Sequence, residues 1–159
     1  MKPVKPEWHN EDKIEASMRL WLERHGWKVD VRASQFGVDI SALDPNERTW
    51  MFEVKGYPST FQKRDGIEKS RNTISTQRQV WLVESVGQIV LRMKSPNIRY
   101  GLVYPDHPTD QYFEKRTLEL SQFVREKLDL WIMLVAETGN VKVLAPQNNR
   151  FMDWSNVIS

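Results

Sequence analysis

Hydrophobic and polar positions change their spacing several times along the chain, and each change marks an expected element. Between residues 11 and 25, apolar residues recur every three or four positions, which predicts an amphipathic helix that begins after Asn10 and ends at Gly26. The apolar stripe consists of Ile14, Met18, Trp21, Leu22 and His25. Residues 27–33 then alternate between apolar and polar, so we expect a half-exposed strand there.

Two further short strands are expected on either side of a turn. Asp44-Pro45-Asn46-Glu47 has typical turn residues, with proline in the second position. The strand before the turn includes residues 36–40, and the strand after it includes residues 51–56. Short connections favour pairing in sequence order, so the three strands should form an antiparallel meander.

The second half of the chain alternates between helical and strand patterns. A polar connection over residues 57–73 leads to a long helix over 74–94, with one stripe of Val83, Val86 and Val90 and another of Gln77, Trp81, Glu84 and Gln88. The expected later elements are a strand over 97–104, a helix over 109–127 capped by Thr109, and strands over 128–136 and 141–144. This order predicts an α/β fold with a mixed sheet of about five or six strands and helices on both faces.

The length of 159 residues favours one domain. We expect an N-terminal arm over residues 1–10, a domain over 11–146 and a C-terminal tail over 147–159. The chain has no cysteine, which excludes disulfides and thiolate-bound metals and suits a cytoplasmic protein. The net charge of +2 is mild, and no apolar run is long enough to cross a membrane.

Three charged residues interrupt the apolar strands beside the turn. Side chains alternate along a strand, so Glu53 and Lys55 share one face while Phe52 points to the other. The hairpin would bring Asp39 alongside them. Two carboxylates and an ammonium at one end of a sheet can hold a hard divalent cation and place a charge beside it.

This arrangement resembles the PD-(D/E)xK nuclease superfamily. The first half-motif is Gly37-Val38-Asp39-Ile40, with Val38 where the family has its proline, and the second is Glu53-Val54-Lys55-Gly56. Glu15 matches the upstream acidic residue of the family. The resemblance implies a restriction-endonuclease-like core, as in Holliday-junction resolvases, that uses Mg²⁺ or Mn²⁺ to hydrolyse phosphodiester bonds in DNA during repair or recombination.

The resemblance also assigns roles. Asp39, Glu53, Glu15 and the Val54 carbonyl would hold the metal, and Lys55 would act on the attacking water or on the developing charge. Gln77, followed by Trp81, is similar to the Gln-x-x-x-Tyr element of RecB-type nucleases, which makes Gln77 a catalytic candidate. A homodimer or a larger nucleic-acid-processing assembly is compatible with the resemblance, with the apolar last hairpin as one candidate interface.

Basic residues are concentrated in the segment from Lys55 to Arg78, which contains six basic and only two acidic residues. In a nuclease they would contact phosphates. The expected DNA contacts are Lys63, Arg64, Lys69, Arg71 and Arg78.

Each assignment has a structural alternative. The motif charges could form a surface salt-bridge ladder, Glu15 could pair with Arg19 one helical turn away, Gln77 could be an exposed helix residue, and the basic segment could be a solvated loop. The functional alternative is a catalytically inactive nuclease-like module that binds nucleic acid or protein.

Overall fold

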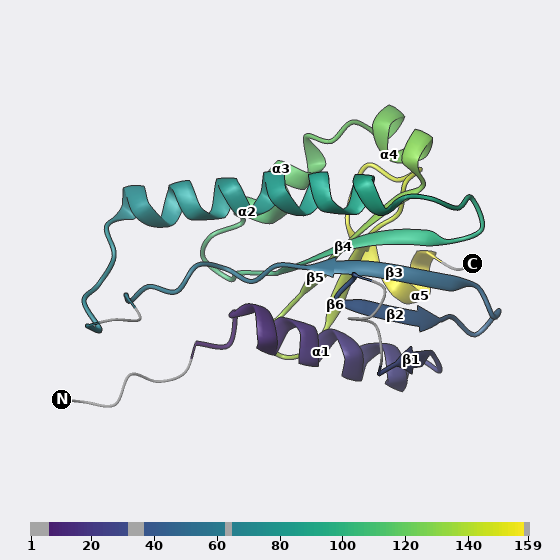
Figure 1. Ribbon diagram of the computed structural model, residues 1–159, viewed down its shortest axis with the longest axis horizontal. Helices are drawn as coiled ribbons and strands as arrows, with labels where there is room; N and C mark the ends of the chain where they lie inside the picture. The colour runs from purple at the N-terminus through teal and green to yellow at the C-terminus, as the bar shows by residue number, and fades with distance from the viewer. Residues whose placement is uncertain (1–6, 32–36, 63–64, 158–159) are drawn as a thin grey trace.

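The computed structural model describes residues 7–31, 37–62 and 65–157 (Figure 1). Lys63 and Arg64, two of the expected DNA contacts, lie outside these ranges, as does the end of the strand expected over residues 27–33. Within the described residues, no helix is both long enough and apolar enough to span a membrane.

The described residues form one mixed sheet of seven strands in the order β1 to β7. The strands are β1 (Lys28–Asp30), β2 (Ile40–Leu43), β3 (Thr49–Val54), β4 (Arg99–Pro105), β5 (Leu130–Val135), β6 (Val141–Leu144) and β7 (Met152–Asp153). The helices are α1 (Glu11–Arg24), α2 (Arg71–Arg92), α3 (Tyr112–Leu118), α4 (Gln122–Leu128) and α5 (Trp154–Val157).

The topology confirms an α/β fold with an antiparallel meander at its start. Strands β1, β2 and β3 pair antiparallel in sequence order. Strands β3, β4 and β5 are parallel, so α2 and the α3–α4 pair are crossover connections. Strands β6 and β7 return antiparallel. The sheet exceeds the expected five or six strands because β7, inside the segment expected to be a tail, pairs with β6.

Helices cover both faces of the sheet, as the pattern predicts (Figure 1). On one face, α1 packs its buried stripe against β3 side chains such as Trp50, Phe52 and Val54. On the other face, α2 and α3 pack against β4 and β5 through Leu82, Ile89 and other buried residues. Side chains alternate along β3, so Phe52 and Val54 point to the α1 layer and Glu53 points to the α2 layer.

The meander is fixed by its turn. Oδ1 of Asp44 accepts hydrogen bonds from the backbone N–H groups of Asn46 and Arg48, both at 2.9 Å, and Oδ2 accepts one from Trp50 Nε1. The amide of Glu47 closes the turn onto the Asp44 carbonyl at 2.9 Å. Asp44 thus sets the register between β2 and β3, which decides what lies opposite the motif residues.

Two helix predictions were wrong in detail. The helix expected over 109–127 is divided into α3 and α4, because the Ser121 hydroxyl accepts the amide of Val124 and starts a second helix. Thr109 does not cap either helix, since Gln111 precedes α3. In α2, the buried positions are Leu82, Ser85 and Ile89, and the valine stripe that the sequence singled out is largely exposed.

The connection between β3 and α2 covers residues 55–70, close to the expected 57–73, and its described residues make regular backbone contacts. Helix α2 begins at Arg71, where the Ser70 side chain caps it by accepting the amide of Thr73. Before it, Phe61 and Glu68 form an isolated antiparallel bridge, and the amide of Lys69 donates to the Thr60 carbonyl at 2.7 Å.

Candidate functional site

The hairpin places Asp39 beside Glu53. Ile40 is paired with Phe52, so the residue before β2 lies next to the end of β3. The Asp39 amide donates to the Phe52 carbonyl at 3.1 Å, and Asp39 Oδ2 accepts the Val54 amide at 2.7 Å. The sequence prediction that these two carboxylates converge is confirmed.

Glu53 is a buried carboxylate, with only 4% of its surface exposed. It lies on the α2 side of β3, where Arg92 at the end of α2 donates to Oε2 and Lys55 Nζ lies 3.9 Å from Oε1. Burial and the nearby charge of Asp39 raise the pKa of Glu53 to about 7, although Arg92 and Lys55 oppose the rise. Near neutral pH this carboxylate is therefore present in both its protonated and its ionised form.

A close approach of two backbone segments brings α1 to Lys55. A Cβ added at Gly56 would lie 2.8 Å from both the Asn10 carbonyl carbon and the His9 oxygen, and closer still to the Glu11 nitrogen. The next amide, that of Tyr57, donates to the His9 carbonyl at 2.8 Å. Only glycine permits this crossing.

The crossing adds Glu11, which sequence reasoning did not single out, to the site. Glu11 Oε2 lies 3.9 Å from Lys55 Nζ, whose side chain is 14% exposed. Burial raises the pKa of Glu11, Lys55 opposes the rise, and the negative charge of Asp39 adds to it. Lys55 thus lies between two carboxylates with raised pKa values, and neither Lys55 nor Glu53 is on a solvent-exposed face.

Glu15 reaches the site through an intermediary. Its Oε1 accepts from Arg19 Nε at 3.1 Å and Nη2 at 2.8 Å, which is the i, i+4 pair of the structural alternative. The same Arg19 Nη2 donates to the Asp39 carbonyl oxygen at 2.6 Å. In this arrangement Glu15 orients Arg19, and Arg19 holds the backbone of Asp39.

Gln77 lies apart from the motif charges. Its Oε1 accepts from Lys69 Nζ at 3.1 Å. Arg92, which does bind Glu53, follows 15 residues later on α2, roughly 22 Å along the helix axis. Gln88, one turn before Arg92, has a buried Oε1 with no hydrogen-bond partner among the described residues, so it is better placed than Gln77 to serve the site.

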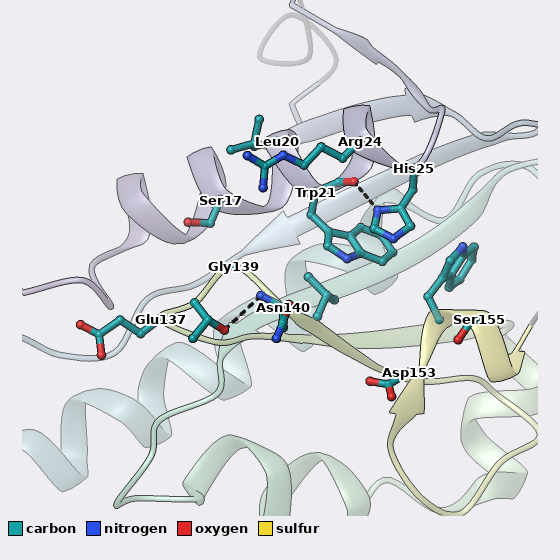
Figure 2. Close-up of a pocket in the computed structure, with 13 residues that line it drawn as sticks. Ser17, Leu20, Trp21, Arg24, His25, Glu137, Gly139, Asn140, Asp153 and Ser155 are labelled. Atoms are coloured by element: carbon teal, nitrogen blue, oxygen red, sulfur yellow. Dashed lines mark hydrogen bonds between the residues drawn. The ribbon is translucent and has the colours of Figure 1, made fainter.

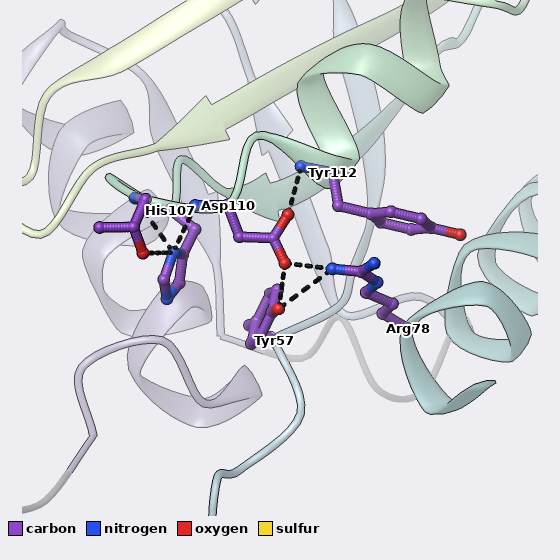
Figure 3. Close-up of polar contacts among 6 residues, drawn as sticks. Tyr57, Arg78, His107, Asp110 and Tyr112 are labelled. Atoms are coloured by element: carbon purple, nitrogen blue, oxygen red, sulfur yellow. Dashed lines mark hydrogen bonds and ion pairs between the residues drawn. The ribbon is translucent and has the colours of Figure 1, made fainter. Parts of the chain in front are cut away.

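The basic residues of the connection have different environments. Arg71 is exposed at the first turn of α2, and Lys69 is partly exposed. Arg78 instead donates to Asp110 and to the Tyr57 hydroxyl, and its guanidinium lies 4.2 Å from the centre of the Tyr112 ring (Figure 3). Arg78 is therefore a structural link between α2 and α3 rather than a free phosphate contact.

Two histidines, His9 and His107, lie close together near the ends of strands β3 and β4. The His9 and His107 rings lie 5.4 Å apart, and the His107 ring lies 4.7 Å from that of Tyr57. Burial and the neighbouring His9 lower the pKa of His107. His107 Nδ1 accepts the amide of Asp110 at 3.1 Å (Figure 3). This pair could not be predicted from the sequence, because His9 and His107 are far apart in the chain.

A cavity of about 740 Å³ lies elsewhere on the protein. It lies between the end of α1, the β5–β6 turn and α5 (Figure 2). Arg24, Glu137 and Asp153 line it together, so it presents charges of both signs and selects no one class of ligand. Asp39, Glu53 and Lys55 do not line it.

The motif charges have the chemistry of a cation site. The negative charge of Asp39 disfavours the ionisation of Glu53, and a divalent cation bound by both carboxylates would remove that repulsion. Within the described ranges, no three His, Cys, Asp or Glu side chains form a ready cage. Magnesium sites commonly use one or two carboxylates and complete their shell with water and substrate oxygens, which fits this pair.

Compared with known proteins, the chain matches no family model, and neither a curated protein nor a solved structure is significantly similar to it. The functional argument consequently depends on the motif and its geometry.

Proposed function

We propose that this protein is a divalent-metal-dependent nuclease of the PD-(D/E)xK type that hydrolyses phosphodiester bonds in DNA. The observation that carries the proposal is the buried Glu53 carboxylate, with Asp39 opposite it and Lys55 beside it at the end of β3. The meander β1–β2–β3 followed by a parallel crossover to β4 is the layout that a restriction-endonuclease-like core would have.

Asp39 and Glu53, with the Val54 carbonyl, would hold Mg²⁺ or Mn²⁺. When bound, the cation would polarise the scissile phosphate and lower the pKa of a coordinated water. Lys55 would orient that water or stabilise the charge that develops on phosphorus, because its ammonium lies next to Glu53. Glu11 shares Lys55 with Glu53, and Glu15 acts through Arg19 to hold the Asp39 backbone.

Arg92 has a distinct role in this proposal. It neutralises Glu53 in the structure described here, so a divalent cation must displace its guanidinium from the carboxylate. Arg92 is already 32% exposed while paired with Glu53, so its guanidinium, once displaced, could contact a phosphate.

The alternative is a nuclease-like module that binds nucleic acid without cutting it. The pairing of Glu53 with Arg92 and Lys55 favours it, because the buried charge is already compensated by protein groups. Incubating the protein with plasmid and single-stranded DNA, with Mg²⁺, with Mn²⁺ and with EDTA, separates the two. Cleavage that requires metal and is lost in Glu53→Gln supports the nuclease, whereas retardation without cleavage supports the module.

A further inference from the structure

The outer face of α2 carries an unpaired apolar seam. Residues 73, 76, 80, 83, 87 and 90 are all exposed, and their spacing alternates between three and four. This is the heptad spacing of a and d positions in a two-stranded coiled coil. Ser85, on the opposite side of the helix, is fully buried against the sheet layer, so the seam points directly away from the protein.

The side chains along the seam suit a closely packed partner helix. Val80, Val83 and Val90 are 48%, 65% and 40% exposed. Gly87 is exposed, and a Cβ added there would meet nothing within 4 Å, so the backbone of α2 is accessible at this seam position. The seam contains Thr, Val and Gly and no charged residue, which permits close approach.

We propose that α2 pairs in parallel with α2 of a second copy of this chain. The residues on either side of the seam favour a second α2 helix as the partner and a parallel orientation for it. In a parallel pair, residue 86 of one copy flanks residue 91 of the other, so half-buried Val86 would cover Leu91, which is 79% exposed. An antiparallel pair that overlays the whole seam would instead place Leu91 against Ser70.

The parallel pair also matches polar groups. Gln79 and Glu84 occupy the other facing positions, where an amide can donate to a carboxylate. The last hairpin, the other candidate interface, offers less exposed apolar surface, because β5 is buried along its whole length and β7 pairs with Lys142 and Val143 of β6. Figure 1 shows α2 on the outside of the fold, with its first turns beyond the end of β3.

The natural chain has no cysteine, so single cysteine variants report on this pairing directly. In a parallel seam each residue meets its own copy, so Val80→Cys, Val83→Cys and Val90→Cys should each form disulfide-linked dimers under mild oxidation. Phe123→Cys is the matched control, because Phe123 is 68% exposed but lies on α4. Cross-linking of the seam variants no faster than the control overturns the proposal, and cross-linking at Val83 alone contradicts the parallel arrangement.

Sedimentation equilibrium of the natural chain gives an independent measurement. The weight-average mass should rise toward twice 18.8 kDa with concentration. Val83→Lys should stay monomeric and should melt at the same temperature as the natural chain at concentrations where that chain is also monomeric, because an exposed side chain contributes little to the monomer. A natural chain that remains monomeric throughout the concentration range overturns the proposal. None of these outcomes depends on nuclease activity.

Discussion

At the scale of single residues, Glu53 is the least favourable ionised group of the site. Two cations contact it, yet burial and Asp39 still raise its pKa to about 7. A purely structural ion pair would be selected to favour the charged form, because breaking a buried pair is costly. The carboxylate of Glu53 therefore reduces stability at neutral pH, as functional groups often do.

This property gives a pH-dependent prediction. The unfolded chain releases the Glu53 proton near pH 4.5 and the folded chain near pH 7, so the folded state binds more protons between these values. The free energy of unfolding should therefore fall as pH rises from about 4.5 to 7, by roughly 2 kcal/mol after allowance for solvent screening. Glu53→Gln should lack this fall and be more stable than wild type at pH 8 in urea titrations.

The control for this prediction is Glu119→Gln. Glu119 pairs with Arg116 on the surface, where its side chain is 60% exposed. Removing the Glu119 carboxylate should leave the pH dependence of the free energy of unfolding unchanged. If Glu53→Gln is instead destabilised at pH 8 to the same degree as at pH 5, the carboxylate stabilises the fold and the structural ladder is the better interpretation.

Sequence reasoning found the residues whose contacts are local. Asp39 and Glu53 converge because the turn residues fix the register of one hairpin. Arg92 could not be found in this way, because it is 39 residues from Glu53 and its approach depends on where a crossover helix ends. Glu11 was missed because nothing in the sequence indicates that α1 crosses β3 at Gly56.

At the scale of elements, the crossing at Gly56 joins α1 to the end of β3. Gly56→Ala must displace the backbone around Glu11, so we expect a loss of about 1–3 kcal/mol in the free energy of unfolding. Gly87→Ala is the matched control at protein concentrations where the chain is monomeric, because the new methyl group then meets nothing and the helix should gain up to about 1 kcal/mol. Thermal melts of both variants measure the difference, and equal effects would show that the crossing is not tight.

The basic connection gives a second prediction at this scale. Lys69→Ala with Arg71→Ala should weaken DNA binding and reduce the slope of log K against log salt by roughly 0.9 for each lost phosphate contact. Arg78→Ala should mainly lower the melting temperature, because it breaks the links to Asp110, Tyr57 and Tyr112. Fluorescence anisotropy across a salt series distinguishes them, and an unchanged slope in the double variant identifies a solvated loop.

Element boundaries were harder to predict than element types. The pattern did not identify the buried side of α2, since the valine stripe and the stripe with Trp81 both have helical spacing. The structure buries a third set around Leu82 and Ile89 and leaves Val83 exposed. The two-residue strand β7 is also too short to produce a sequence pattern and exists because β6 offers it an edge.

At the scale of the whole molecule, the order of elements was enough to predict the layers. A meander followed by a crossover requires a mixed sheet with helices on both faces, and this was confirmed. The layers place Phe52 and Val54 in the α1 core and turn Glu53 toward α2. The fold thus places a buried carboxylate, Glu53, beside the half-buried Asp39, and this pair is the basis of the proposed cation site.

The most direct test of this claim is a calorimetric Mn²⁺ titration of wild type, Asp39→Asn and Lys55→Ala. Asp39→Asn keeps the shape of the side chain and removes one charge, so Mn²⁺ affinity should fall at least tenfold. Lys55→Ala should bind Mn²⁺ at least as tightly as wild type, because lysine is not a ligand and its positive charge opposes the cation. Equal Mn²⁺ affinity of wild type and Asp39→Asn, or no detectable binding by wild type, would contradict the account.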